Sequence, residues 1–266
     1  MIKYIFSAIF VYFFIGLVLF LFQRKILFNT SGKPKKPEYY DLYNIDTIRI
    51  PTTDKINLLA WYSKPVNHNP LLIYFHGNSY DIGERAYRIK RYIKYGWGVL
   101  LLAWRGYSGN LGTPSEKNLY IDAESTLNWI NDNTNIDKKN IIIYGESLGA
   151  AVAVNIGTKY KFKSIILEAP FTSVADIASK RYKIFPVKHL IMDKFDNYSK
   201  IDKIISPVLF ISGKKDEITP HSHSLKLYSK ANQPKDSVFI DEAMHNNLYD
   251  FNINKDVIKF NLKKWK

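Results

Sequence analysis

The sequence predicts an α/β protein in which helices cover both faces of a mostly parallel sheet. From residue 45 onward, short runs of aliphatic and β-branched residues alternate with longer segments of helical period. This alternation is typical of strands joined by helical crossovers. The 266 residues are 46% hydrophobic and 23% charged, so the chain can bury one sizeable core.

Eight segments are predicted to be strands. The first two alternate and are expected to be antiparallel, whereas the later ones are continuous apolar runs, as in buried central strands. In chain order the eight are residues 45–50, 56–63, 71–75, 98–104, 140–144, 164–168, 208–212 and 237–240.

Helical spacing of apolar residues marks the segments between these strands. Residues 82–93 and 119–130 each place aliphatic side chains on one face. Residues 150–154 are small and suit close packing on a sheet, and 258–265 predict a closing amphipathic helix.

An uncharged apolar run over residues 4–22 precedes the folded part. As a helix, at about 1.5 Å per residue, it would be roughly 28 Å long, which is close to the hydrocarbon thickness of a bilayer. No small-residue cleavage pattern follows it, so we favour an uncleaved transmembrane anchor over a signal peptide. Lysines and arginines concentrate on the carboxyl side of the run, which predicts that the folded domain faces the cytoplasm.

We therefore divide the chain into an anchor with its flanks (1–28), a polar linker (29–44) and a folded domain (45–266). The interval 170–206 is too long for a simple crossover and predicts a small helical lid. Its aromatic side chains could pack on the body or line a binding pocket, and both interpretations stay open for Phe171, Tyr182, Phe185, Phe195 and Tyr198.

The net charge of +14 is compatible with nucleic acid, with an anionic membrane surface, or with a lysine-rich composition alone. The lysines are spread along the chain and no nucleic-acid-binding motif accompanies them, so we expect no nucleic-acid partner. The absence of cysteine excludes disulfides, thiolate metal sites and a cysteine nucleophile.

The segment Gly145-Glu146-Ser147-Leu148-Gly149 matches the pattern G-x-S-x-G. It directly follows a predicted strand and precedes a predicted helix, which is the setting of a nucleophile elbow. Glycine is expected at 145 and 149 because side chains there would collide with neighbouring strands. Ser147 is the predicted nucleophile, at a helix N-terminus that favours developing negative charge.

A serine hydroxyl needs a base, and His245 follows the last predicted strand in the chain order serine, acid, histidine. Asp216, after the strand 208–212, is the preferred acid. Glu217 and Glu168 are its rivals. The other histidines have simpler interpretations: His68 in a turn, His189 in the lid, His221 and His223 on the surface, and His76 as a loop organiser.

Acyl transfer also requires donors for the oxyanion of the tetrahedral intermediate. One is expected to be the backbone N–H of Leu148, the residue after the nucleophile. The other should come from the loop after the third strand, where Asn78 is preferred and Gly77 is the alternative.

Taken together, these motifs resemble a known family over roughly residues 20–265. The residues that carry the resemblance are His76-Gly77-Asn78, Arg105 to Gly109, Gly112 to Glu116, Gly145 to Gly149, Glu168 to Ser173, Asp216 to Pro220 and His245 to Asn247. They resemble the single-pass, membrane-anchored α/β-hydrolase-domain proteins, related to monoacylglycerol lipases and depalmitoylating thioesterases. The resemblance implies the α/β-hydrolase fold, a Ser147–Asp216–His245 triad and a lipid-like or acylated substrate. The chain lacks the cysteine-rich N-terminus by which some relatives are palmitoylated.

The expected function is that of a serine hydrolase cleaving ester or thioester bonds through an acyl-enzyme, without metal or organic cofactor. A serine peptidase of the same fold is the alternative. A membrane-tethered binding protein without activity is a third. Acyl-chain length and oligomeric state are not predicted.

Overall fold

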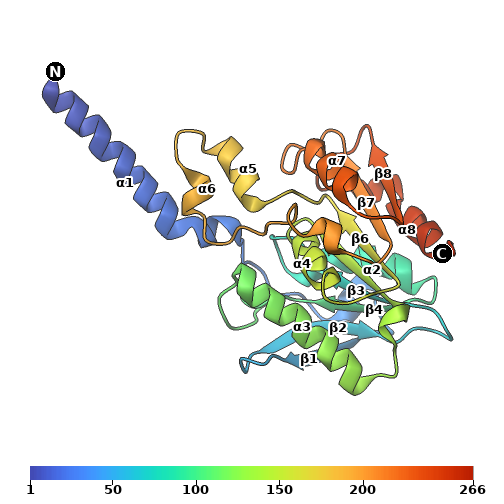
Figure 1. Ribbon diagram of the computed structural model, residues 1–266. Coiled ribbons are helices and arrows are strands. Elements are labelled where there is room, and N and C mark those ends of the chain that lie inside the picture. Colours follow the sequence, from blue (N-terminus) through green and yellow to red (C-terminus); the bar gives the residue numbers. More distant parts are fainter. Residues whose placement is uncertain (266) are drawn as a thin grey trace.

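A computed structural model describes residues 1–265 of the chain. Its centre is a sheet of eight strands in the order β1-β2-β4-β3-β5-β6-β7-β8 (Figure 1). All eight predicted strands are confirmed; β3 and β6 have the predicted ends, and the ends of the others differ by at most two residues. Their bounds are β1 Asp46–Pro51, β2 Asn57–Ser63, β3 Leu71–Phe75, β4 Gly98–Leu102, β5 Ile141–Glu146, β6 Ser164–Glu168, β7 Val208–Gly213 and β8 Lys235–Ile240.

The sheet is mixed but mostly parallel. β2 pairs antiparallel with both β1 and β4, and the strands from β4 to β8 in the sheet order are parallel. Phe75 at the end of β3 lies opposite Gly145 of β5. Because parallel strands end at the same edge, the loops after β3, β5, β7 and β8 gather there.

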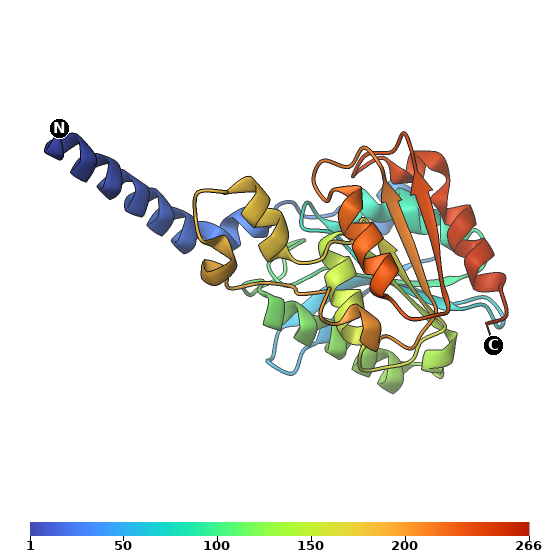
Figure 2. The same cartoon turned by 45° about the horizontal axis from the view of Figure 1, so that its top comes forward.

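Two helical layers enclose the sheet, one on each face (Figures 1 and 2). Side chains of β3 alternate between the two cores: Leu71, Ile73 and Phe75 belong to one, and Leu72 and Tyr74 to the other. The first core also holds side chains of α3 (Glu116–Asn133), α4 (Leu148–Gly157) and α7 (His221–Lys230), and the second those of α2 (Ala86–Ile93) and α8 (Ile253–Leu262). Short 3-10 turns complete the chain at η1 Pro37–Tyr40, η2 Ile82–Arg85, η3 Lys138–Asn140, η4 Ile201–Lys203 and η5 Leu248–Phe251.

The long interval between β6 and β7 contains two short helices, α5 (Val174–Arg181) and α6 (Val187–Leu190). We call residues 174–192 the cap. They stand at the end of the molecule from which the N-terminal helix projects (Figures 1 and 2).

The N-terminal apolar run forms one helix, α1 (Ile2–Leu27), with no fully buried residue. By length and composition it is able to cross a membrane. Its first part points away from the domain, and its last turns lie beside the cap (Figure 2). Phe28, directly after it, is buried in the core of the domain.

Candidate active site

Ser147 lies in a sharp turn between β5 and α4. Its backbone has φ 50° and ψ −108°, a left-handed conformation that is costly for a non-glycine residue. A Cβ on Gly145 would lie 2.5 Å from the Ala150 Cα, and one on Gly149 would lie 2.0 Å from the carbonyl oxygen of Phe75. Steric crowding therefore requires glycine at both positions, which explains the G-x-S-x-G sequence of this strand–turn–helix connection.

The loops after β7 and β8 bring two further side chains to Ser147. The Nε2 atom of His245 lies 3.1 Å from the Ser147 Oγ, and its Nδ1 atom lies 2.7 Å from Asp216 Oδ2. Three residues from three separate loops are thus joined in one hydrogen-bonded chain. The arrangement allows a proton to pass from the serine hydroxyl to the imidazole while the carboxylate holds the ring.

The Asp216 carboxylate is almost fully buried and well supplied with donors. Its Oδ1 accepts hydrogen bonds from the backbone N–H groups of Ile218 (2.9 Å) and Thr219 (2.8 Å), and its Oδ2 accepts one from the Thr219 hydroxyl (2.8 Å). Burial alone would raise its pKa, but the hydrogen bonds and charge of His245, with those of Thr219, lower the pKa below the ordinary value. Asp216 therefore stays ionised beside the imidazole.

Neither rival acid contacts His245. Glu217 is an exposed residue of the same loop and lines the same cavity as Ser147. Glu168 is buried, but its carboxylate is bound by Arg88 (3.0 Å) and by the hydroxyl of Tyr144. Among the three acids that the sequence offered, Asp216 alone is hydrogen-bonded to His245.

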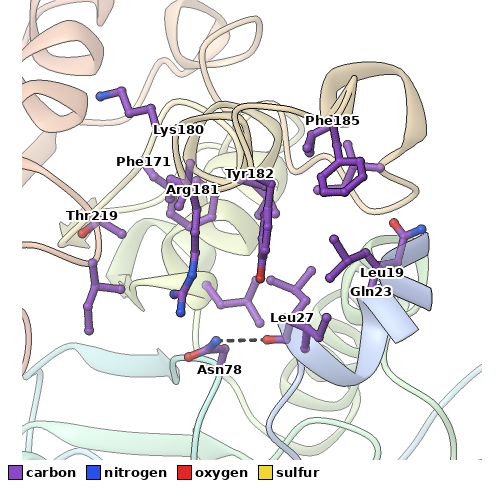
Figure 3. A pocket seen from close by; sticks show the side chains of 18 of the residues that line it. Leu19, Gln23, Leu27, Asn78, Phe171, Lys180, Arg181, Tyr182, Phe185 and Thr219 are labelled. Atoms are coloured by element: carbon purple, nitrogen blue, oxygen red, sulfur yellow. Dashed lines mark hydrogen bonds between the residues drawn. The ribbon is translucent and has the colours of Figure 1, made fainter. Parts of the chain in front are cut away.

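The predicted oxyanion donors lie beside the nucleophile. Leu148 is the first residue of α4, and Asn78 follows β3; both line the same cavity as Ser147, whereas Gly77 does not. Asn78 is held on three sides: its carbonyl oxygen accepts from the Asn29 N–H and the Tyr107 hydroxyl, and its side-chain amide donates to the carbonyl of Leu27 (Figure 3).

His76 is fully buried in the loop before Asn78. Its Nδ1 lies 2.7 Å from the carbonyl oxygen of Gly77, and its Nε2 accepts from the Trp104 N–H at 3.4 Å. Burial and the nearby Arg85 charge lower the pKa of His76 to about 3. A neutral ring bridging two backbone segments is a loop organiser, as predicted.

One expectation about histidines is wrong. His223 is 3% exposed rather than on the surface, and its Nδ1 accepts from the backbone N–H of Thr172 at 3.3 Å. It is buried because the first turn of α7 packs against the segment that follows β6. His68 and His189 are exposed, as expected.

Ser147 opens into a cavity of about 640 Å³, a volume typical of small-molecule sites (Figure 3). Its walls are mainly apolar and come mostly from α1 and the cap, with smaller contributions from the start of α4 and from the segment between β7 and the first turn of α7. Both interpretations of the aromatic residues hold, for different members: Phe171, Tyr182 and Phe185 line the cavity, whereas Phe195 is buried in the core and Tyr198 is exposed.

A buried ionic cluster behind the elbow was not predicted. Glu146, the residue before Ser147, is paired with Arg85 at 2.7 Å, and Arg88 bridges Glu146 and Glu168. Although burial opposes it, the charges of Arg85 and Arg88 lower the pKa of Glu146. A glutamate inside a motif that packs against a sheet was the available signal, because a buried carboxylate requires a cation.

Comparison with known proteins places this geometry in a family. The sequence model of the prolyl oligopeptidase family matches residues 112–247, a stretch that contains Ser147, Asp216 and His245. An uncharacterized protein of Mycobacterium tuberculosis is 31% identical over 250 residues, covering 92% of this chain and 89% of that protein. Human alpha/beta hydrolase domain-containing protein 17B is 33% identical over 178 residues, or 66% of this chain and 60% of the relative.

Solved structures agree on the fold. The Pyrococcus furiosus esterase Pf2001 superposes with a TM-score of 0.73 at 18% identity, covering 88% of this chain and 95% of that one. An acetyl xylan esterase from Paenibacillus gives a TM-score of 0.65 at 15% identity, with 88% and 96% covered. The chain belongs to the α/β-hydrolase superfamily.

Proposed function

We propose that the protein is a membrane-anchored serine hydrolase that cleaves carboxylic ester or thioester bonds of lipid-like or acylated substrates. The observation that carries the proposal is the hydrogen-bonded chain from Ser147 through His245 to Asp216, placed at the end of an apolar cavity. These three side chains supply the nucleophile, the base and the acid that acyl transfer requires.

In the proposed reaction the Ser147 Oγ attacks the substrate carbonyl carbon while His245 Nε2 takes the hydroxyl proton. The resulting oxyanion accepts hydrogen bonds from the backbone N–H groups of Leu148 and Asn78. His245 then gives its proton to the leaving alcohol or thiol, which departs and leaves an acyl-enzyme. Water, deprotonated by the same imidazole, attacks the acyl carbon; the bond to Ser147 Oγ then breaks, the imidazolium returns its proton to that oxygen, and the acid is released. Asp216 stabilises the imidazolium at each step.

The apolar cavity supports an acyl group rather than a polar one on the acid side of the bond. Aromatic and aliphatic side chains from the cap, such as Tyr182 and Phe185, line the cavity into which Ser147 opens. Burying a hydrocarbon chain there would contribute about 0.8 kcal/mol for each methylene group removed from water.

The apolar helix α1 supports membrane anchoring, and the cations that follow it support a cytoplasmic domain near an anionic leaflet. Protease treatment of intact and permeabilised cells tests this arrangement. Digestion of the domain only after permeabilisation is expected, and digestion in intact cells would contradict the cytoplasmic orientation.

A fluorophosphonate probe tests the nucleophile directly. The wild-type protein should be labelled and should hydrolyse p-nitrophenyl and thiocholine esters, whereas Ser147→Ala should do neither. Equal labelling of both proteins would refute the assignment of Ser147. A folded wild type that is inert to the probe and to all esters would favour a binding protein.

A serine peptidase is the second candidate, because the sequence model that matches residues 112–247 is that of the prolyl oligopeptidase family. Turnover of aminoacyl-coumarin amides without turnover of esters would favour it over the hydrolase proposed here.

A further inference from the structure

One face of the N-terminal helix lines the same cavity as Ser147. Six residues of α1 contribute, at the spacing of a single helical face: Gly16, Leu19, Phe20, Gln23, Ile26 and Leu27. At 1.5 Å per residue, Gly16 and Leu27 are about 16 Å apart along the helix axis. The cavity is therefore an elongated groove that follows α1 for three turns.

Exposure along α1 shows the same face independently. The half-buried residues of the helix are Tyr12, Gly16, Leu19, Gln23 and Leu27, which recur every three or four positions. The opposite face, which includes Leu21, is exposed. An anchor that served only as a tether would leave no such stripe against the protein.

Specific contacts attach this face to the cap. The ring of Tyr12 stacks on Phe185 with centroids 4.9 Å apart, and its hydroxyl donates to the carbonyl of Ile184 at 2.8 Å. Gly16 packs against the ring of Phe185: a Cβ added to Gly16 would lie 3.3 Å from a ring carbon. The distal end of the groove is thus closed by aromatic packing between α1 and the cap.

Polar contacts fix the carboxyl end of the helix. Gln23, directly after the apolar run, accepts a hydrogen bond from the Met192 N–H (2.8 Å) and donates one to the carbonyl of Leu190 (3.4 Å). Arg24 pairs with the buried carboxylate of Asp193 at 2.8 Å. These contacts attach α1 to the cap, so that the helix and the cap form opposite sides of the groove.

The other end of the groove reaches the catalytic loops. The carbonyl of Leu27 accepts from the Asn78 side chain at 3.0 Å, and the Asn29 N–H donates to the Asn78 carbonyl at 3.1 Å. In Figure 3 Leu27 lies next to Asn78, while Leu19 and Phe185 lie at the far end. Position along α1 thus corresponds to distance from the reacting serine.

We propose that the acyl chain of the substrate lies along this face of α1, between the helix and the cap, and that α1 determines the acyl-chain length. The proposal rests on the proposed ester or thioester hydrolysis at Ser147. The carbonyl would sit near Leu27 and Asn78, and the methyl end near Leu19 and Gly16. The substrate class is a long-chain acyl ester or thioester.

The test compares Leu19→Trp with Leu21→Trp in the full-length protein in phosphatidylcholine nanodiscs. Both variants add an indole to α1, but only position 19 lines the groove. We measure kcat/KM for p-nitrophenyl acetate, butyrate, laurate and palmitate. Leu19→Trp should lower the values for laurate and palmitate by about tenfold or more, a typical effect of pocket shape on aliphatic groups, and leave acetate and butyrate within about twofold. Leu21→Trp should match the wild type throughout.

A second variant, Gly16→Leu, fills the distal end without touching the proximal part. It should reduce turnover of palmitate and leave turnover of laurate unchanged. A substitution farther from Ser147 should thus exclude only the longer acyl chains. An equal loss on all esters, or no loss with either groove variant, would overturn the role of α1. Absence of wild-type turnover and of fluorophosphonate labelling would instead refute the proposed function, so the two failures are distinguishable.

Discussion

Arg85 donates to both carboxylate oxygens of Glu146, at 2.7 and 3.0 Å, and with its remaining amino group to the carbonyl of Ser79 at 2.8 Å. Glu146 is adjacent to Ser147, and Ser79 is adjacent to Asn78. One buried guanidinium therefore ties the nucleophile elbow to the loop that carries the proposed oxyanion donor. Only an arginine can make this pair of parallel hydrogen bonds to one carboxylate, since a lysine ammonium cannot bind in a bidentate geometry.

We predict that Arg85→Lys lowers kcat by about tenfold or more with little change in KM, because the donors are less well placed for the transition state while the apolar groove is intact. Fluorophosphonate labelling should slow in parallel. Arg91→Lys, on helix α2, which directly follows Arg85, removes a guanidinium that bonds to residues in and next to α8; it is the control and should keep wild-type kinetics. A rise in KM at constant kcat would argue against a positioning role.

The acid of the triad can be assigned by a pair of neighbouring substitutions. Asp216→Asn should lower kcat by about 10³–10⁴-fold, because the amide can no longer hold the imidazole in the productive tautomer or stabilise its charge. Glu217→Gln, one residue away and exposed, should change kcat by less than about threefold. Ester turnover by the two purified proteins is the measurement, and a reversed order of the two effects would assign the role to Glu217.

Burial of neutral His76 predicts acid sensitivity. Its pKa is lowered to about 3 in the folded protein, whereas the unfolded chain takes up the proton near the ordinary histidine value. Stability is therefore lost as the pH falls below about 6.5, and this one group should account for about 2 kcal/mol between neutral pH and pH 5.

His76→Gln is expected to narrow that difference, even if it lowers stability at pH 8 by disturbing the loop. Urea midpoints at pH 8 and pH 5 give the comparison. The same change at the exposed His68 should leave the pH dependence as in the wild type. An unchanged pH dependence in His76→Gln would show that other groups cause the acid loss.

A second buried ion pair concerns stability rather than catalysis. Arg105 contacts the fully buried carboxylate of Asp122 and also Asp54. Arg105→Ala should lower the free energy of unfolding by about 3–5 kcal/mol, because Asp122 would remain charged and unpaired or become protonated at a cost. Lys159→Ala, which removes a surface pair with Glu124, should cost less than about 1 kcal/mol in the same urea titration. Similar losses in both variants would contradict the distinction between the two pairs.

Much of this architecture follows from local sequence rules. Strand period, glycine positions and chain order predicted the eight strands, the elbow at Ser147 and the loops of Asp216 and His245, because each depends on a few neighbouring residues. The tertiary structure then brought those three side chains within hydrogen-bond distance, and it assigned the imidazole contact to Asp216 rather than to Glu217 or Glu168.

Other features were decided only by contacts between distant segments. The surface interpretation of His223 was wrong because the start of α7 packs on Thr172, which lies fifty-one positions earlier. Arg85 meets Glu146 across sixty-one positions, and Gln23 meets Met192 across 169. An apolar helix has the same composition whether lipid or protein covers a given face, so the sequence by itself determined that α1 is apolar. Only the packing of the cap against α1 decided which face of that helix reaches the serine.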